Sequence, residues 1–168
     1  ICCGRPVYLS GQKQAYYEIV RHTRERILSC QPKVIITSCP ICLNSFKNNY
    51  FFPVPVIHHT QYLDSLIKQG VMLPEQSDLK TIYHDPCELG RNQGIYREPR
   101  HVLRHIVRLQ NNLYKKNEGL CCGGSVADLE MDWEDKQKIA ADAIRQLIQA
   151  DTQMLATSCP LCKITFKA

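Results

Sequence analysis

The sequence predicts an α/β protein with two similar lobes, each built from a small, mainly parallel sheet flanked by helices. Short apolar runs of strand length alternate along the chain with longer segments of helical periodicity, which is the pattern of such folds. One segment also occurs twice, because residues 32–42 match residues 152–162 and both end in Thr-Ser-Cys-Pro-x-Cys. The 168 residues are 44% hydrophobic and 22% charged, which is ordinary globular usage. An internal repeat within an alternating pattern indicates two related lobes.

The first lobe begins with an amphipathic segment over 16–27, whose apolar residues share one helical face. An apolar run over 34–37 predicts a buried strand that leads into a helix at the Cys-Pro-Ile-Cys run, residues 39–42. Proline suits the first turn of a helix. We therefore expect both cysteines of this run to lie at a helix N-terminus, where free N–H groups favour thiolate.

The next elements complete the first lobe. Residues 54–58 predict a strand, and a helix follows with Thr60 as its N-cap and Gly70 as its C-cap. On this basis residues 1–72 are the C-terminal part of a first repeat and residues 73–79 are a linker.

The second repeat is expected to span residues 80–168. It contains a strand over 81–84, a helix from Pro99 through Val107, a short strand over 113–116 and an amphipathic helix over 139–148. The repeated strand and Cys-Pro-Leu-Cys helix then close the chain. Ligands of parallel sheets bind beyond the C-terminal ends of the strands, so cysteines that follow these strands should gather at one sheet edge.

Composition excludes several classes of protein. The net charge of +5 is spread along the chain, which does not favour a nucleic-acid-binding surface. No apolar run is long enough to predict a membrane span, and no secretory leader opens the chain. Because the chain starts with Ile1 rather than Met, we interpret it as a fragment of a longer protein, with the first lobe truncated at its N-terminus.

The ten cysteines form two unequal sets, with Cys30 outside both. The first set is Cys2, Cys3, Cys39 and Cys42. The second set is Cys87, Cys121, Cys122, Cys159 and Cys162. Thiolates in such number select zinc, copper(I) or iron–sulfur clusters. A vicinal pair is awkward for one zinc ion but can reach different irons of a cluster, and Gly123 and Gly124 would let the backbone approach such a group. Structural zinc and dithiol–disulfide exchange remain the alternatives.

Two histidine positions are candidates for supporting roles. His84 ends a predicted strand near Cys87, so it either hydrogen-bonds or relays protons to a bound group, or it packs while Asp85 caps the turn. His58 and His59 follow a strand in the first lobe, where a satisfied core role is favoured over metal ligation.

The second set resembles the cysteine-rich "CCG" domain family. The resemblance rests on Cys87, on Cys-Cys-Gly-Gly at 121–124, on Cys-Pro-Leu-Cys at 159–162 and on His-Asp-Pro at 84–86, and it covers essentially the whole chain. The family occurs, usually in tandem, in one of the subunits of heterodisulfide reductase. It is also found in iron–sulfur subunits of glycolate oxidase, lactate-utilisation proteins, anaerobic glycerol-3-phosphate dehydrogenase and an unusual succinate dehydrogenase.

The resemblance implies a [4Fe–4S] cluster, of non-cubane type in the heterodisulfide reductases, held by all five cysteines of the second set. It places His84, Gly123 and Gly124 around that cluster and assigns no catalytic residue. The first set lacks a leading cysteine, so it implies a second cluster, a zinc site or an empty site. The expected role is an electron-transfer component of an oxidoreductase, which reduces a disulfide or serves a 2-hydroxy acid or glycerol-3-phosphate dehydrogenase. A zinc-stabilised binding module without redox activity is the alternative.

The same resemblance implies the partners and the location. FAD is expected only on a partner, which would be a flavin- or ferredoxin-type subunit or fused domain. The protein is expected in the cytoplasm or, through a partner, at the inner face of the membrane.

Overall fold

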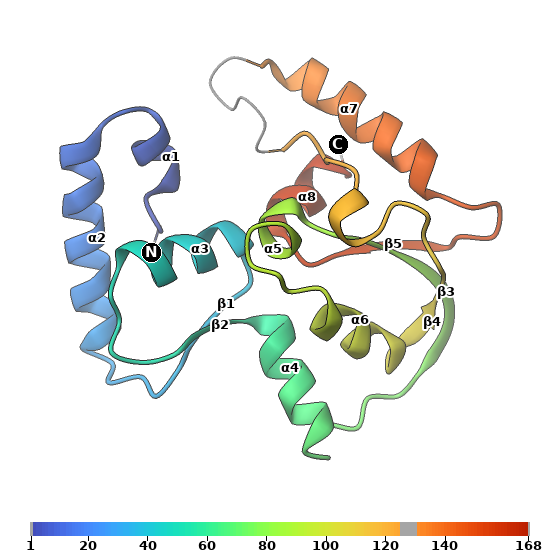
Figure 1. Cartoon of the computed structure of the whole chain (residues 1–168), viewed down its shortest axis with the longest axis horizontal. Helices are drawn as coiled ribbons and strands as arrows, with labels where there is room; N and C mark the ends of the chain where they lie inside the picture. The colour runs from blue at the N-terminus through green and yellow to red at the C-terminus, as the bar shows by residue number, and fades with distance from the viewer. Residues whose placement is uncertain (1, 125–130, 168) are drawn as a thin grey trace. The chain divides into compact units, whose positions relative to one another are not determined.

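The computed structural model describes residues 2–124 and 131–167 (Figure 1). The chain divides into two compact units, Ile1–His59 and Thr60–Ala168. Each unit has its own parallel sheet flanked by helices, one of two strands and one of three. The α/β class and the two small parallel sheets predicted from the sequence are therefore confirmed, whereas the repeat boundaries at 1–72, 73–79 and 80–168 stay a prediction.

The first unit pairs two short strands that each lead into a helix. Its elements are α1 (Arg5–Leu9), α2 (Lys13–Leu28), β1 (Ile35–Thr37), α3 (Pro40–Asn49) and β2 (Val56–His58). Strands β1 and β2 are parallel, with Ile35 opposite Val56 and Thr37 opposite His58. Helix α1 packs against α2 and α3, and α3 covers the sheet.

The core of the first unit forms where α3 presents its apolar face. Leu43 and Tyr50 are buried, and the Phe46 ring meets the Tyr50 ring edge-on with centroids 4.7 Å apart. Pro40 starts the helix and the extended backbone of Cys39 precedes it, which confirms the predicted start of this helix. The helix thus carries its Cys-Pro-Ile-Cys run at a fixed place after β1.

The second unit holds the larger sheet. Its elements are β3 (Ser77–His84), α5 (Cys87–Gly90), α6 (Arg97–Arg104), β4 (Val107–Leu109), the 3₁₀ turn η1 (Lys116–Glu118), α7 (Trp133–Leu147), β5 (Met154–Thr157) and α8 (Pro160–Thr165). Helix α4 (His59–Lys68) leads into it. The strand order is β4-β3-β5, and both neighbours run parallel to β3.

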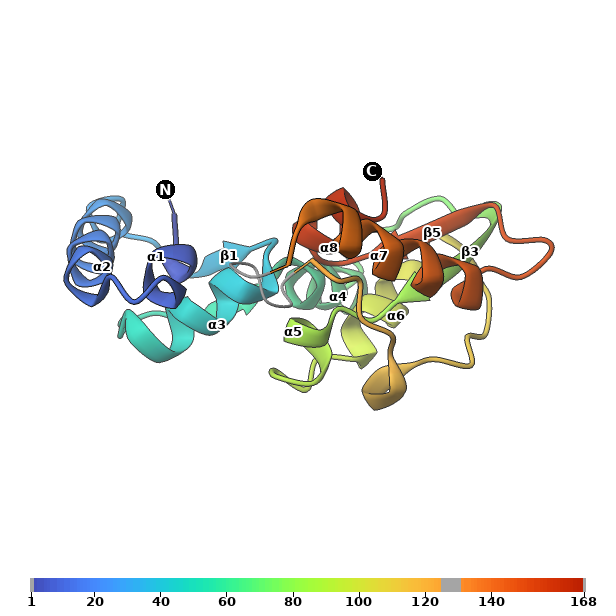
Figure 2. The ribbon, with the colours of Figure 1, turned by 90° about the horizontal axis from the view of Figure 1, so that it is seen from above.

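The connections of this sheet leave β3 in opposite directions. The chain passes through α6 to β4 on one side of β3 and later through α7 to β5 on the other side. Helices α6 and α7 lie on opposite faces of the sheet (Figures 1 and 2), as right-handed crossovers in opposite directions require. Such a reversal opens a crevice at the C-terminal ends of the two strands concerned, here β3 and β5.

Three local predictions were wrong. Helix α6 ends at Arg104 rather than Val107, because Val107–Leu109 pairs with β3 as strand β4. Residues 113–116 form no strand, and the 3₁₀ turn η1 starts at Lys116. Helix α4 begins at His59, so Thr60 lies in its first turn and is not an N-cap. In the first case strand pairing outweighs a helical periodicity that continued through Ile106 and Val107.

The described residues include no helix with the length and apolar character needed to cross a membrane.

Candidate functional site

All five cysteines of the second set lie beyond the C-terminal ends of the strands in the second unit. Cys87 starts α5 directly after β3. Cys121 and Cys122 lie on the connection from β4 to α7. Cys159 precedes α8, and Cys162 lies in its first turn, directly after β5. The crevice between β3 and β5 is therefore bordered by cysteines from three separate segments.

The five thiols fall into two contacting groups. Cys122 Sγ lies 3.1 Å from Cys162 Sγ, and Cys159 hydrogen-bonds to Cys162. These three residues are buried in one cluster, against which Leu161 and Phe166 pack. Cys87 and Cys121 are half-buried and hydrogen-bond to each other. The vicinal pair thus divides its side chains, one toward each group.

Glycine at two positions lets the backbone reach the sulfurs. The Gly123 N–H donates to Cys121 Sγ over 3.3 Å, and the Gly124 N–H donates to Cys122 Sγ over 3.4 Å. Gly123 has a φ of 79°, which a side chain disfavours. A Cβ on Gly124 would lie 2.8 Å from Leu161 Cγ. Both glycines predicted from the sequence are therefore required by local geometry.

These contacts make the vicinal pair the acidic half of the set. The Cys87 thiol and the Gly123 N–H lower the pKa of Cys121 to about 6, against the opposing effect of burial. The Cys162 thiol and the Gly124 N–H lower the pKa of Cys122 to about 7 in the same way. The pKa values of Cys87 and Cys162 are raised, because each holds its proton to donate to its partner in the vicinal pair. Thiolate is the form that binds metal.

The first unit repeats this arrangement with four cysteines. The Gly4 N–H donates to Cys2 Sγ over 3.4 Å, and Gly4 has a φ of 75°, as Gly123 does. The thiol of Cys42 hydrogen-bonds to buried Cys3 and lowers the pKa of Cys3 to about 6. Cys3, Cys39 and Cys42 thus correspond to Cys122, Cys159 and Cys162. Cys2 is exposed at the edge of this set.

A buried ion pair supports the segment that leads to Cys121. The Asp85 carboxylate accepts hydrogen bonds from both terminal nitrogens of Arg100, with Nη1 at 2.6 Å, and from the Lys116 N–H at 2.8 Å. The Asp85 and Arg100 side chains are only 3% and 13% exposed. Arg100 also lies over the Tyr83 ring, 5.1 Å from its centroid. Asp85 therefore fixes η1 to the end of β3.

Two further side chains hold the same segment by its carbonyl groups. Arg91 Nη1 donates to the Gly119 carbonyl over 2.8 Å. His84 Nε2 donates to the Leu120 carbonyl over 3.0 Å, so its proton is on Nε2 and Nδ1 faces the Thr157 hydroxyl at 3.4 Å. Burial lowers the pKa of His84 to about 4, so the ring is neutral at pH 7. His84 is thus a positioning residue next to the vicinal pair.

The other half of the set is held from β3 as well. The Tyr83 hydroxyl, in a buried side chain, donates to Ser158 Oγ over 3.0 Å, directly before Cys159. In the first unit His58 Nε2 lies 3.3 Å from the Ser38 carbonyl, directly before Cys39. His58 therefore has the satisfied core role that the sequence favoured over metal ligation.

Sequence reasoning missed most of this support. It treated Asp85 as a turn cap and left Arg100 among scattered surface charges, although the two form the buried pair. A carboxylate directly after a buried strand needs a cation, and Arg100 in the following helix was the available signal. Arg91 was interpreted as a solvent-facing or locally paired residue, whereas it binds the Gly119 carbonyl.

The donor set fits soft-metal chemistry. Five thiols with N–H groups directed at two of their sulfurs match the ligands and outer hydrogen bonds of iron–sulfur centres. Over residues 2–124 and 131–167, no three His, Cys, Asp or Glu side chains surround a single point as ligands of one metal ion would. The thiols instead line the crevice in two groups, which would suit a group with several metal atoms.

Comparison with known proteins identifies the family. The profile of the CCG family, described as a cysteine-rich domain, matches residues 1–47 and 81–167. The chain belongs to the CCG cysteine-rich domain family. The two matched stretches contain both cysteine sets, and no solved structure matches the chain.

Several relatives are named redox proteins. The chain is 30% identical to a subunit of the dihydromethanophenazine:CoB–CoM heterodisulfide reductase of Methanosarcina mazei, over 96% of this chain and 42% of the relative. It is 30% identical to the EtfAB:quinone oxidoreductase of Syntrophomonas wolfei, over 96% and 24%. It is 33% identical to the probable iron–sulfur-binding oxidoreductase FadF of Bacillus subtilis, over 90% and 22%. The chain thus spans less than half the length of these relatives.

Proposed function

We propose that this chain is the iron–sulfur electron-transfer part of a larger oxidoreductase. The observation that carries the proposal is the set of five thiols at the end of β3 and β5, with two N–H groups already directed at the vicinal sulfurs. The names of the relatives support it, because they include iron–sulfur and heterodisulfide oxidoreductases. A bound [4Fe–4S] group would accept and pass on single electrons.

The chain's own residues would hold and insulate that group. Cys87, Cys121, Cys122, Cys159 and Cys162 would ligate it, with the N–H groups of Gly123 and Gly124 directed at its sulfur ligands. Leu161 and Phe166 pack against the buried thiols and would keep water from that side. Neutral His84 would place the vicinal pair without adding a charge.

The first set would hold a second cluster or zinc. Cys2, Cys3, Cys39 and Cys42 supply four thiols, which is the number that structural zinc requires. The electrons would come from a flavin- or ferredoxin-type subunit or domain. Their acceptor would be a disulfide, which takes two electrons and two protons to give two thiols, or a further carrier.

Metal analysis of the full-length protein purified without oxygen tests the proposal. We expect a brown protein with about four irons and matching acid-labile sulfide for the second set. Cys122→Ser should lose most of this iron, whereas Cys30→Ser should keep it, because Cys30 is an exposed thiol outside both sets. Stoichiometric zinc without iron at the second set would contradict the proposal and support the structural-zinc alternative.

A further inference from the structure

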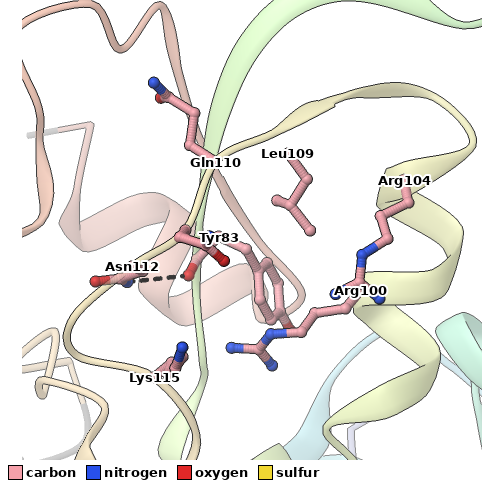
Figure 3. Close-up of a pocket in the computed structure, with 8 residues that line it drawn as sticks. Tyr83, Arg100, Arg104, Leu109, Gln110, Asn112 and Lys115 are labelled. Carbon is pink, nitrogen blue, oxygen red and sulfur yellow. Dashed lines mark hydrogen bonds between the residues drawn. The ribbon is translucent and has the colours of Figure 1, made fainter.

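A small cavity with cationic walls lies at the C-terminal end of β4, apart from the cysteine groups. Its volume is about 80 Å³, and Tyr83, Arg100, Arg104 and Lys115 contribute to its lining, with Gln110 and Asn112 (Figure 3). Cavities for drug-sized ligands or cofactors measure roughly 300–1,000 Å³. This one has room only for a compact group, and it lies at the sheet edge where parallel folds bind ligands.

The charges around the cavity do not balance within the protein. Arg100 is neutralised by Asp85. Within the described part of the chain, no carboxylate or other acceptor meets the Arg104 guanidinium or the Lys115 ammonium group. The cavity therefore carries two uncompensated positive charges. In Figure 3 the cationic ends of Arg100, Arg104 and Lys115 lie around the Tyr83 ring.

The remaining polar walls are already committed to internal hydrogen bonds. The Gln110 amide donates to Asp151 over 2.7 Å and accepts from the Thr152 hydroxyl over 3.1 Å. The Asn112 amide donates to the Tyr83 carbonyl over 3.4 Å and accepts from the Tyr114 N–H over 2.9 Å. These bonds fix the wall and leave the two cations as the groups that can bind a ligand.

We propose that this cavity binds the phosphate group of inorganic phosphate or of a small phosphomonoester. A phosphate carries about two negative charges at neutral pH, which matches the two unpaired cations, whereas one arginine neutralises a carboxylate. Bound phosphate would contact Lys115, the residue directly before the segment that Asp85 fixes at Lys116. The ligand would thereby add a contact to the segment that leads to Cys121.

Thermal unfolding of the full-length protein in sodium phosphate, compared with sodium chloride at equal ionic strength, tests the site. Phosphate should raise the midpoint in a concentration-dependent way, because a ligand of the folded state stabilises it. Arg104→Gln and Lys115→Gln should each weaken the apparent phosphate affinity about tenfold, since each removes a charged hydrogen bond. Arg108→Gln, an exposed charge on β4 outside the cavity, should leave the affinity unchanged.

Two further ligands identify what the cavity accepts. Methyl phosphate with the same affinity as inorganic phosphate would assign the site to phosphomonoesters, and a much weaker effect would assign it to free phosphate. The proposal fails if acetate stabilises as strongly as phosphate. It also fails if phosphate acts no differently from chloride, or if both cavity variants keep the parent affinity.

Discussion

Loss of the Arg100 charge should be among the most damaging single changes in the second unit. Arg100→Met keeps an apolar stem over the Tyr83 ring but removes both guanidinium hydrogen bonds to Asp85. The Asp85 carboxylate is 3% exposed, so water cannot replace them, and only the Lys116 N–H remains as a donor. Breaking a buried ion pair on one side costs about 3–5 kcal/mol. Because one donor is kept, we expect a loss of about 3 kcal/mol in the free energy of unfolding.

Urea unfolding of the reduced, anaerobic full-length protein measures this loss. Arg104→Met is the matched control, because it removes the same charge one turn later on α6, where the side chain is exposed. Such surface changes stay within about 0.5 kcal/mol. The double variant Arg100→Met/Asp85→Leu should recover part of the loss, since no buried charge is left unpaired. If Arg100→Met and Arg104→Met unfold at the same urea concentration, the buried pair does not support this segment.

Three other changes test individual contacts of the site. Gly124→Ala should destabilise by about 1–3 kcal/mol and lower metal retention, because its Cβ would lie 2.8 Å from Leu161 Cγ; parent-like unfolding and iron content would contradict this. Ser158→Ala should cost about 1–3 kcal/mol in urea unfolding, because it leaves the buried Tyr83 hydroxyl without its acceptor; an unchanged midpoint would refute it. Burial lowers the pKa of His84 to about 4, so only the unfolded chain takes up its proton between about pH 6.5 and 4. Stability present above pH 6.5 should fall by roughly 3 kcal/mol over that range, and His84→Gln should flatten this fall when unfolding is measured against pH.

The fold was predictable where local signals agreed with tertiary structure. The starts of α3 and α8 follow from proline in the first turn after an apolar strand, and both observed helices begin there. Strand β4 was not predictable in this way. Its three residues continue the helical periodicity of α6, and only pairing with β3 makes them a strand.

The candidate site was predictable in its ligands but not in its supports. Cysteine spacing alone indicates which thiols belong together, because the pattern occurs twice. The roles of Asp85, Arg91 and His84 depend instead on partners 28 to 36 residues away in sequence, at Gly119 and Leu120 among others. Such contacts have no local signature, so one sequence cannot reveal them.

The place of β5 in the sheet sets the order in which the site can be completed during biosynthesis. Cys87 and the vicinal pair are brought together by contacts within residues 83–122, all available early in synthesis. Cys159 and Cys162 join only when β5 pairs with β3, whose contacting residues Lys80 and Gln153 are 73 positions apart. A nascent chain that has not yet produced β5 can therefore present three thiols but not five. Insertion of any group that needs all five must wait until that last strand is in place.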